Sequence, residues 1–270
     1  GSLIGGDGYY NTVVGFNNLV TTSNTYANTV VGSESYQGSR GSYNIVMGHQ
    51  AMKSSDSVNF NIALGYQSMY YSSGSSNIAL GTGSLMDNQG DANVAVGNFA
   101  MAFPAKSKYN TAIGTAAMGW SSGGNYNAAL GHYTLHGNMG SYNTAVGDSA
   151  LWRNGEGEYN TAVGAGANIA RFDLTNITAI GAGAIVDASN KVRIGNSAVT
   201  VIEGQVPFTT PSDGRFKFNI HDDVKGLDFI LQLRPVTYQF DVKRFDQALG
   251  STADQKLYDD ALQMRRSGFI

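Results

Sequence analysis

The stretch from Asn11 to Gly204 repeats one short phrase about a dozen times, and this regularity constrains the fold more than any other feature. The phrase is Asn-x-x-x-Gly with an aliphatic residue directly before the glycine. Successive glycines are 16 or 17 residues apart until the final step, which is 14. A period of this length predicts a solenoid. The copies end at Gly15, Gly32, Gly48, Gly65, Gly81, Gly97, Gly114, Gly131, Gly147, Gly164, Gly181 (which lacks the asparagine) and Gly195 (which is degenerate).

Each copy predicts a short β-strand. In Asn160-Thr161-Ala162-Val163-Gly164, threonine and valine favour an extended backbone, and alternation places Thr161 and Val163 on one face and Ala162 on the other. The residue before the glycine, here called the pre-glycine column, is never polar, so we expect it to face the interior of the coil. This column is Val14, Val31, Met47, Leu64, Leu80, Val96, Ile113, Leu130, Val146, Val163, Ile180 and Ile194.

The opposite face of the strand is also small and apolar. A solenoid strand needs only one face toward its own interior, so a second apolar face predicts a neighbouring chain, and a roll this narrow gains stability by association. We therefore expect this middle column to pack against a sister chain in a homotrimer. It contains Val13, Val30, Val46, Ala63, Ala79, Ala95, Ala112, Ala129, Ala145, Ala162 and Ala179.

Three further features of the repeat predict how a coil closes. An apolar residue four positions after the glycine predicts a second, facing strand. The glycine permits a positive φ at a tight corner, and a buried asparagine can bond the coils above and below it. An aromatic strip is expected immediately before the asparagines. The facing residues are Leu19, Tyr36, Met52, Met69, Leu85, Met101, Met118, Leu135 and Leu151, and the strip is Tyr10, Tyr43, Phe60, Tyr109, Tyr126, Tyr142 and Tyr159.

The motif Asn-Thr-Ala-Val-Gly, followed by Gly-x-x-Ala-Leu, resembles the head repeat of trimeric autotransporter adhesins and of related bacterial and phage fibres. The resemblance covers about residues 5–204. It implies a left-handed parallel β-roll assembled as a trimer. The adhesin repeat is shorter, so we expect longer loops here.

Beyond residue 204 the composition changes. Residues 205–211 read as an extended connector with two prolines, and residues 212–270 predict a small α+β domain. Its segments Ser212-Asp213-x-Arg215-x-Lys217-x-Asn219-Ile220, Leu227–Leu233, Pro235–Tyr238 and Ser267–Ile270 resemble the first half of the intramolecular chaperone, or auto-processing, domain of phage tailspikes such as endosialidases. The expected elements are a strand ending at Ile220, a helix over Asp222–Leu233, a strand over Val236–Asp241, a helix over Ala253–Arg266 and a strand over Ser267–Ile270.

This second resemblance implies a domain that trimerises the chain, lets the preceding fibre fold in register and, in many members, cuts itself off after the serine. The scissile bond is then Ser212-Asp213, with Ser212 and Lys217 as the catalytic pair. Lys217 acts as a base only if burial or a nearby cation such as Arg215 lowers its pKa. Attack by Ser212 on its own carbonyl would need a four-membered ring, so a serine of another chain or a lysine-activated water is easier.

Composition excludes several other classes. A net charge of −3 argues against a nucleic-acid binder, no apolar run is long enough to span a bilayer, and the absence of cysteine removes disulfides and thiolate metal sites. His49, His132 and His136 have no partners at ligand spacing, so we expect no metal and no cofactor. The chain begins Gly1-Ser2 without Met, which suggests a fragment or a processed product.

The sequence therefore predicts an extracellular homotrimeric fibre with a structural and adhesive function, located on a cell surface, a virion or a tail fibre. Its other partners would be a glycan or protein receptor and, in a filament, further trimers. One alternative is a self-cleaving fibre precursor, whose only enzymatic activity is on itself. Another is an ice-binding solenoid, using a threonine column that Ile45, Ile62, Ile78 and Val94 interrupt. Its threonines are Thr12, Thr29, Thr111, Thr144 and Thr161.

Overall fold

The structure is a computed structural model, and it describes residues 8–19, 25–152, 154–205, 226, 235–239, 241, 244 and 265–269. The chain divides into two compact units, Gly1–Asn196 and Ser197–Ile270. The first unit contains the repeats and is mainly β.

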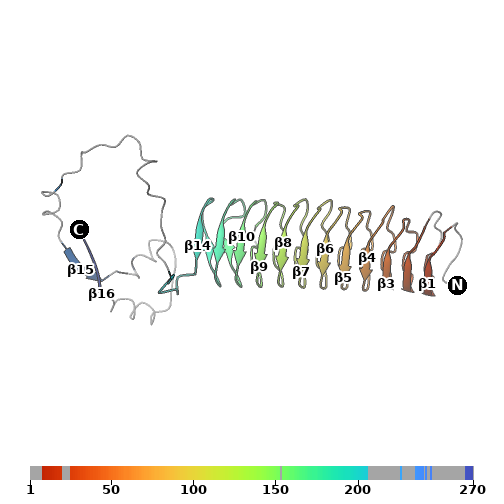
Figure 1. The fold of residues 1–270 in the computed structure, drawn as a ribbon, viewed down its shortest axis with the longest axis horizontal. Coiled ribbons are helices and arrows are strands. Elements are labelled where there is room, and N and C mark those ends of the chain that lie inside the picture. Colours follow the sequence, from red (N-terminus) through yellow and green to blue (C-terminus); the bar gives the residue numbers. More distant parts are fainter. Residues whose placement is uncertain are drawn as a thin grey trace. The chain divides into compact units, whose positions relative to one another are not determined.

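The first unit is a parallel β-solenoid with one strand for each predicted copy of the repeat (Figure 1). The strands pair in sequence order within one 12-stranded sheet, so equivalent repeat positions lie beside one another, as in Ala112↔Ala129 and Ala129↔Ala145. The predicted fold class is confirmed. The strands are β1 (Thr12–Phe16), β2 (Thr29–Ser33), β3 (Ile45–His49), β4 (Ile62–Leu64), β5 (Ile78–Leu80), β6 (Val94–Val96), β7 (Thr111–Ile113), β8 (Ala128–Leu130), β9 (Thr144–Val146), β10 (Thr161–Val163), β12 (Thr178–Ile180) and β14 (Val192–Ile194).

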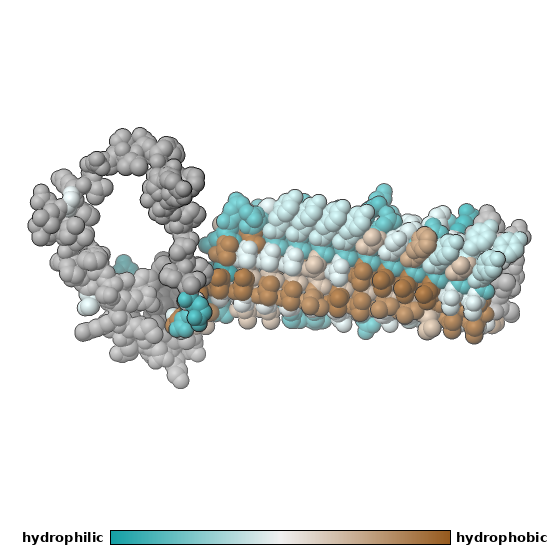
Figure 2. Space-filling model, viewed as in Figure 1, coloured by the Kyte–Doolittle hydropathy of each residue, from teal (hydrophilic) through white to brown (hydrophobic). Residues whose placement is uncertain are grey.

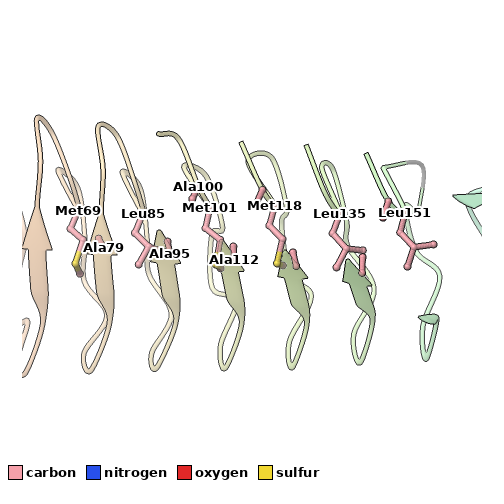
Figure 3. Packing of buried hydrophobic residues seen from close by; sticks show 14 of the residues in the cluster. Met69, Ala79, Leu85, Ala95, Ala100, Met101, Ala112, Met118, Leu135 and Leu151 are labelled. Carbon is pink, nitrogen blue, oxygen red and sulfur yellow. The ribbon is translucent and has the colours of Figure 1, made fainter. Parts of the chain in front are cut away.

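The core is a single layer of side chains between the strands and the turns opposite them. Long Met and Leu side chains from the turns point toward the strand alanines, as Met101 and Met118 do beside Ala95 and Ala112 (Figure 3). The middle-column alanines of β4 to β10 and β12 are almost completely inaccessible to solvent within the single chain. One methyl facing one long side chain fills the narrow interior without a void, which native packing density requires.

The predicted roles of the two strand faces are therefore wrong. The middle column faces the interior of its own coil and needs no sister chain to cover it, whereas members of the pre-glycine column such as Met47 and Leu130 are each 49% exposed. The physical reason is size. A flat coil whose turns contribute a long side chain has room for only a small residue, alanine or valine, on the strand side, and the bulkier aliphatic residues point outward.

The segment facing the strands is a turn in most coils, which also differs from the prediction. The predicted facing residues from Leu19 to Leu151 all have a positive φ, between 46° and 53°, so they cannot belong to an extended strand. In the described part of the solenoid, a second sheet forms only near the end, where β11 (Asn168–Ile169) pairs with β13 (Ile185–Val186). These later coils carry β-branched residues, for which the left-handed conformation is unfavourable, so the backbone there is extended.

The corner glycines behave as predicted. Gly131 has a φ of +137°, and a Cβ atom built on it would lie 2.5 Å from the carbonyl oxygen of Gly147 in the next coil. Both the backbone conformation and the close approach of the next coil therefore require glycine at this corner.

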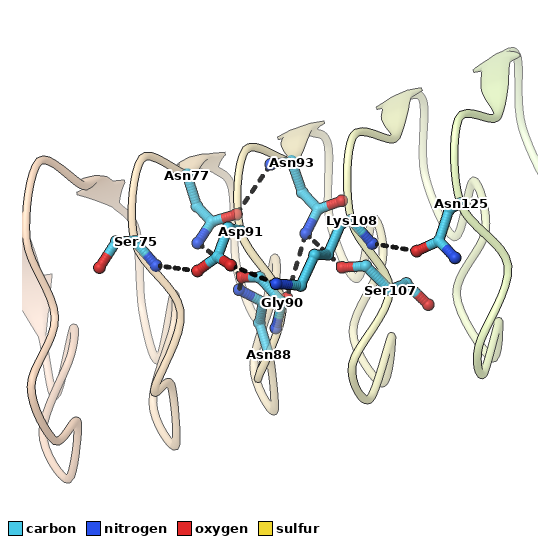
Figure 4. A network of polar contacts seen from close by, with 9 residues as sticks. All are labelled: Ser75, Asn77, Asn88, Gly90, Asp91, Asn93, Ser107, Lys108 and Asn125. Carbon is cyan, nitrogen blue, oxygen red and sulfur yellow. Dashed lines mark hydrogen bonds and ion pairs between the residues drawn. The ribbon is translucent and has the colours of Figure 1, made fainter.

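A ladder of buried asparagines runs along the other corner, also as predicted. The backbone N–H of Asn93 donates to Asn77 Oδ1 at 2.8 Å, and Asn93 Nδ2 donates to the carbonyl of Ser107 at 2.8 Å (Figure 4). Asn93 Oδ1 in turn accepts the N–H of Asn110 at 3.0 Å. Each side chain thus satisfies backbone groups that would otherwise be buried without partners. The last asparagine of the ladder is Asn160, whose Oδ1 accepts the N–H of Ile177. Ile177 takes the place of asparagine in the next coil.

Replacing one ladder asparagine tests this role. Asn127 Oδ1 accepts the N–H of Asn143, so Asn127→Ala leaves this buried N–H without its acceptor. The carbonyl of Gly140 loses the bond from Asn127 Nδ2 but keeps the one from Asn138 Nδ2 at 2.7 Å. We expect a loss of about 1–3 kcal/mol in the free energy of unfolding. Chemical denaturation measures it. Asn98→Ala is the matched control, since Asn98 is exposed and accepts one 3.3 Å bond from Thr82. Equal destabilisation by both changes would contradict the role of the ladder.

In the second unit, β15 (Pro235–Gln239) and β16 (Arg265–Phe269) pair antiparallel, with Thr237 opposite Ser267. Both predicted strands are present, but the second begins at Arg265, inside the segment expected to be helical. Of the helix predicted over residues 222–233 the structure describes Gly226, which is not helical. The remainder of that helix, residues 253–264 and the strand predicted to end at Ile220 lie outside the described residues.

Candidate functional site

The outward face of the 12-stranded sheet is the largest candidate site. The first and third residues of each strand point away from the core, because the second residue, which lies between them, faces inward. The third residues are the pre-glycine column, which is aliphatic in every strand, and neither outward column contains a charged residue. Figure 2 shows the apolar side chains as a brown band along the solenoid. We call these two columns the strand face.

The strand face is most apolar in β3 to β6, where both columns are aliphatic. Ile45 and Met47 of β3 are 45% and 49% exposed, and Ile78 and Leu80 of β5 continue the same two columns. Parallel pairing places equivalent residues about 4.8 Å apart, so the apolar surface is continuous from coil to coil. A continuous exposed apolar surface of this length is typical of an interaction site rather than of a free surface.

The threonine column is part of the strand face but is discontinuous. Thr144, Thr161 and Thr178 pair in register, and Ala128 separates Thr144 from Thr111. The four residues from β3 to β6 predicted to interrupt the column do so. A regular threonine array of the kind that an ice-binding surface needs therefore covers only part of the sheet.

The predicted aromatic strip forms in part. The rings of Tyr109, Tyr126, Tyr142 and Tyr159 stack in sequence, with 5.0 Å between neighbouring centroids and nearly parallel planes. Tyr43 and Phe60 form a second stack, also at 5.0 Å. Ser76 and Ala92 occupy the equivalent positions between the two groups, which explains the gap. The stacked rings bury each other's faces and leave mainly their edges exposed.

Sequence reasoning missed a partner of His132. Its Nδ1 lies 2.9 Å from Oδ1 of Asp148, the residue at the equivalent position one coil later. The spacing of 16 residues, equal to the repeat, is the signal that could have revealed the pair. Among the described residues, no three His, Cys, Asp or Glu side chains converge as a metal site would require.

Charged side chains pair between coils on the loop side. Lys108 Nζ lies 2.7 Å from Asp91 Oδ2 (Figure 4), and the hydrogen bond from Lys108 lowers the pKa of the Asp91 carboxyl. Both side chains are more than 40% exposed, so the pair contributes little to stability. We assign no chemistry to it.

The predicted autocleavage residues Ser212 and Lys217, together with Asp213 and Arg215, lie outside the described residues. The structure therefore gives no geometry for the pair.

The comparisons with known proteins concern mainly this second unit. Residues 212–260 match the family model described as chaperone of endosialidase. No curated protein sequence matches the chain significantly. Within the described residues, no helix is long and apolar enough to cross a membrane. The class that emerges is a tail-fibre-type structural protein, consisting of a parallel β-solenoid and a segment of the chaperone type.

Proposed function

We propose that the chain forms a homotrimeric fibre in which the strand faces of three copies pack against one another. The observation that supports this most is the uncharged strand face, whose pre-glycine column is apolar on all twelve strands and is partly or fully exposed in the single chain. Removing aliphatic surface from water contributes about 25 cal/mol per Å², so covering this surface would provide a large driving force for association.

The family match at residues 212–260 supports an assembly of three chains. This segment matches the chaperone family, and the resemblance implies a domain that assembles as a trimer and aligns the preceding fibre. The pre-glycine column is aliphatic in every coil, so shifting one chain by a single coil would still place aliphatic residues against aliphatic residues. Another part of the chain must therefore fix how the three copies align. A trimerising domain at one end supplies such a starting point. The mass of the intact chain in solution tests the proposal, and we expect three chains.

The biological role that follows is structural and adhesive. A rigid rod of coils suits a surface fibre, a phage tail fibre or an extracellular filament, exposed to a receptor or joined end to end to other trimers. An adhesive fibre needs only a stable shape and a contact surface.

Self-cleavage is the second candidate function, supported by the motif around Ser212 and by the family match that begins at that residue. Cleavage of the Ser212-Asp213 bond would yield a fragment ending at Ser212. Intact-mass spectrometry of the expressed chain detects it. Self-cleavage would be established by this fragment in the unaltered chain together with its loss in Ser212→Ala and in Lys217→Met. A chain that stays whole after prolonged incubation as a folded trimer would reject self-cleavage.

A further inference from the structure

Exposed aromatic side chains gather on the turn side of the coils that contain β6, β7 and β8. The ring centroids of Phe103 and Trp120 are 4.7 Å apart, and those of Tyr133 and His136 are 5.0 Å apart. Trp120 is 64% exposed, which is unusual for the largest apolar side chain. We call Phe103, Trp120, Tyr133 and His136 the aromatic patch.

The two halves of the patch adjoin at Gly119. A Cβ atom at Gly119 would lie 3.3 Å from Cδ2 of His136, so the imidazole ring of one coil lies over the backbone that precedes Trp120 in the coil before it. The patch is also held rigidly. Met118 and Leu135, in the same two turns, are fully buried, and the N–H of Tyr133 donates to the carbonyl of Thr115 at 3.1 Å.

A polar rim borders the rings. The ring of His132 meets that of Tyr133 edge-on, with 4.4 Å between centroids, and His132 bonds Asp148. Ser149 Oγ donates to the other Asp148 oxygen at 3.0 Å. The hydrogen bonds from His132 and Ser149 lower the pKa of Asp148, so at neutral pH the rim presents a carboxylate, which accepts hydrogen bonds.

We propose that the aromatic patch binds a neutral glycan through pyranose rings with equatorial hydroxyls, such as β-linked glucose or N-acetylglucosamine units. The axial C–H bonds of such a sugar form a flat apolar face that packs on an aromatic ring, while its hydroxyls project sideways and donate to a carboxylate. Trp120 and Phe103 supply the rings, and Asp148 supplies the acceptor. The carboxylate disfavours an anionic sugar by like-charge repulsion.

The size of the patch favours a glycan over a protein. It covers three coils, which is two steps of about 4.8 Å along the solenoid. A stable protein interface buries about 800 Å² on each partner, which is far more than four side chains on three coils provide. A few sugar units fit this length.

The patch remains accessible in the proposed trimer. Trp120, Tyr133 and His136 belong to the turns that also contribute Met118 and Leu135, whose side chains face the strands across the core. Sister chains would instead pack on the strand face. The proposal names a ligand class for the adhesive role and rests on that role. It does not depend on the number of chains, so a monomeric protein that binds the glycan would refute the trimer alone.

Tryptophan fluorescence tests the proposal directly, because the chain contains only two tryptophans, Trp120 and Trp152. Trp152→Phe makes Trp120 the only reporter. We expect a saturable change in emission when the full-length variant is titrated with a β-1,4-linked hexamer of glucose or of N-acetylglucosamine, up to about 10 mM. A hexamer of sialic acid, which is anionic, should bind at least about ten-fold more weakly.

Calorimetry on substituted proteins, titrated with a neutral hexamer and with the sialic acid hexamer, completes the test. Trp120→Ala should weaken binding at least about ten-fold, and Asp148→Asn by a smaller factor, with unchanged circular dichroism. Tyr126→Ala, in the tyrosine stack, is the control and should leave affinity unchanged. No saturable binding of either neutral hexamer would overturn the proposal. So would equal binding by Trp120→Ala, or tighter binding of the sialic acid hexamer.

Discussion

Ala129→Glu is expected to prevent the coils around β8 from folding. Ala129 is 2% exposed in the single chain, at the centre of a core only one side chain thick. A carboxylate there has neither room nor a partner, and such burial is among the few changes that destabilise by more than about 4 kcal/mol. If the middle column packed against a sister chain, as the sequence analysis expected, this change would weaken assembly instead. Because the middle column lies inside the coil, we expect the substitution to unfold the coil itself rather than only to weaken the contact between chains. Circular dichroism and thermal unfolding measure it.

The neighbouring residue gives a control on the same strand. Ala128 is exposed on the strand face, so Ala128→Glu changes the same residue type to the same charge without entering the core. We expect Ala128→Glu to retain the circular dichroism spectrum of the unaltered protein. If both variants unfolded alike, or if Ala129→Glu folded normally, the assignment of Ala129 to the core and of Ala128 to the surface would be wrong.

Leu130→Glu is expected to keep the coil and abolish assembly. Leu130 is the third residue of β8 and is 49% exposed, so the substituted side chain reaches water in the single chain. In the trimer it would place three carboxylates on the covered strand faces, where loss of hydration and like-charge repulsion oppose association by several kcal/mol. Sedimentation should therefore show single chains at concentrations where the unaltered protein is trimeric.

A matched change on the turn side separates this effect from a general effect of added charge. Trp152→Glu introduces the same side chain at a position that is 44% exposed but away from the strand face. It should remain trimeric. A trimeric Leu130→Glu with an unaltered spectrum would show that the strand face does not form the contact.

Much of the solenoid could be predicted from the sequence, because its ladders repeat with the coil. Residues 16 or 17 positions apart occupy equivalent places in neighbouring coils, so the positions of Asn93 and Asn110, or of Tyr126 and Tyr142, indicate contact without any knowledge of the core. The same logic applies to the corner glycines, whose carbonyl neighbours leave no room for a Cβ atom.

The inside and outside of the strand could not be told apart in this way. Alternation separates the two faces, but both are apolar, and larger side chains are usually assigned to the core. The decisive fact is that the turn opposite already fills the interior with residues such as Met118 and Leu135. Only the combined volume across the coil shows that alanine must face inward.

The shape of the facing turn depends on branching at Cβ. Leu151 adopts a φ of 51°, which an unbranched Cβ tolerates, whereas Ile169 and Val186 lie in short strands. The change from Leu or Met to β-branched residues after residue 164 is visible in the sequence. It predicts a change from turn to strand once the preference of each residue type is considered.

The mass of the full-length chain in solution tests the account most directly. Light scattering over a dilution series should give three times the chain mass of 28.5 kDa, with dissociation in Leu130→Glu but not in Trp152→Glu. A folded protein that remains a single chain at all concentrations would contradict the packing of the strand faces.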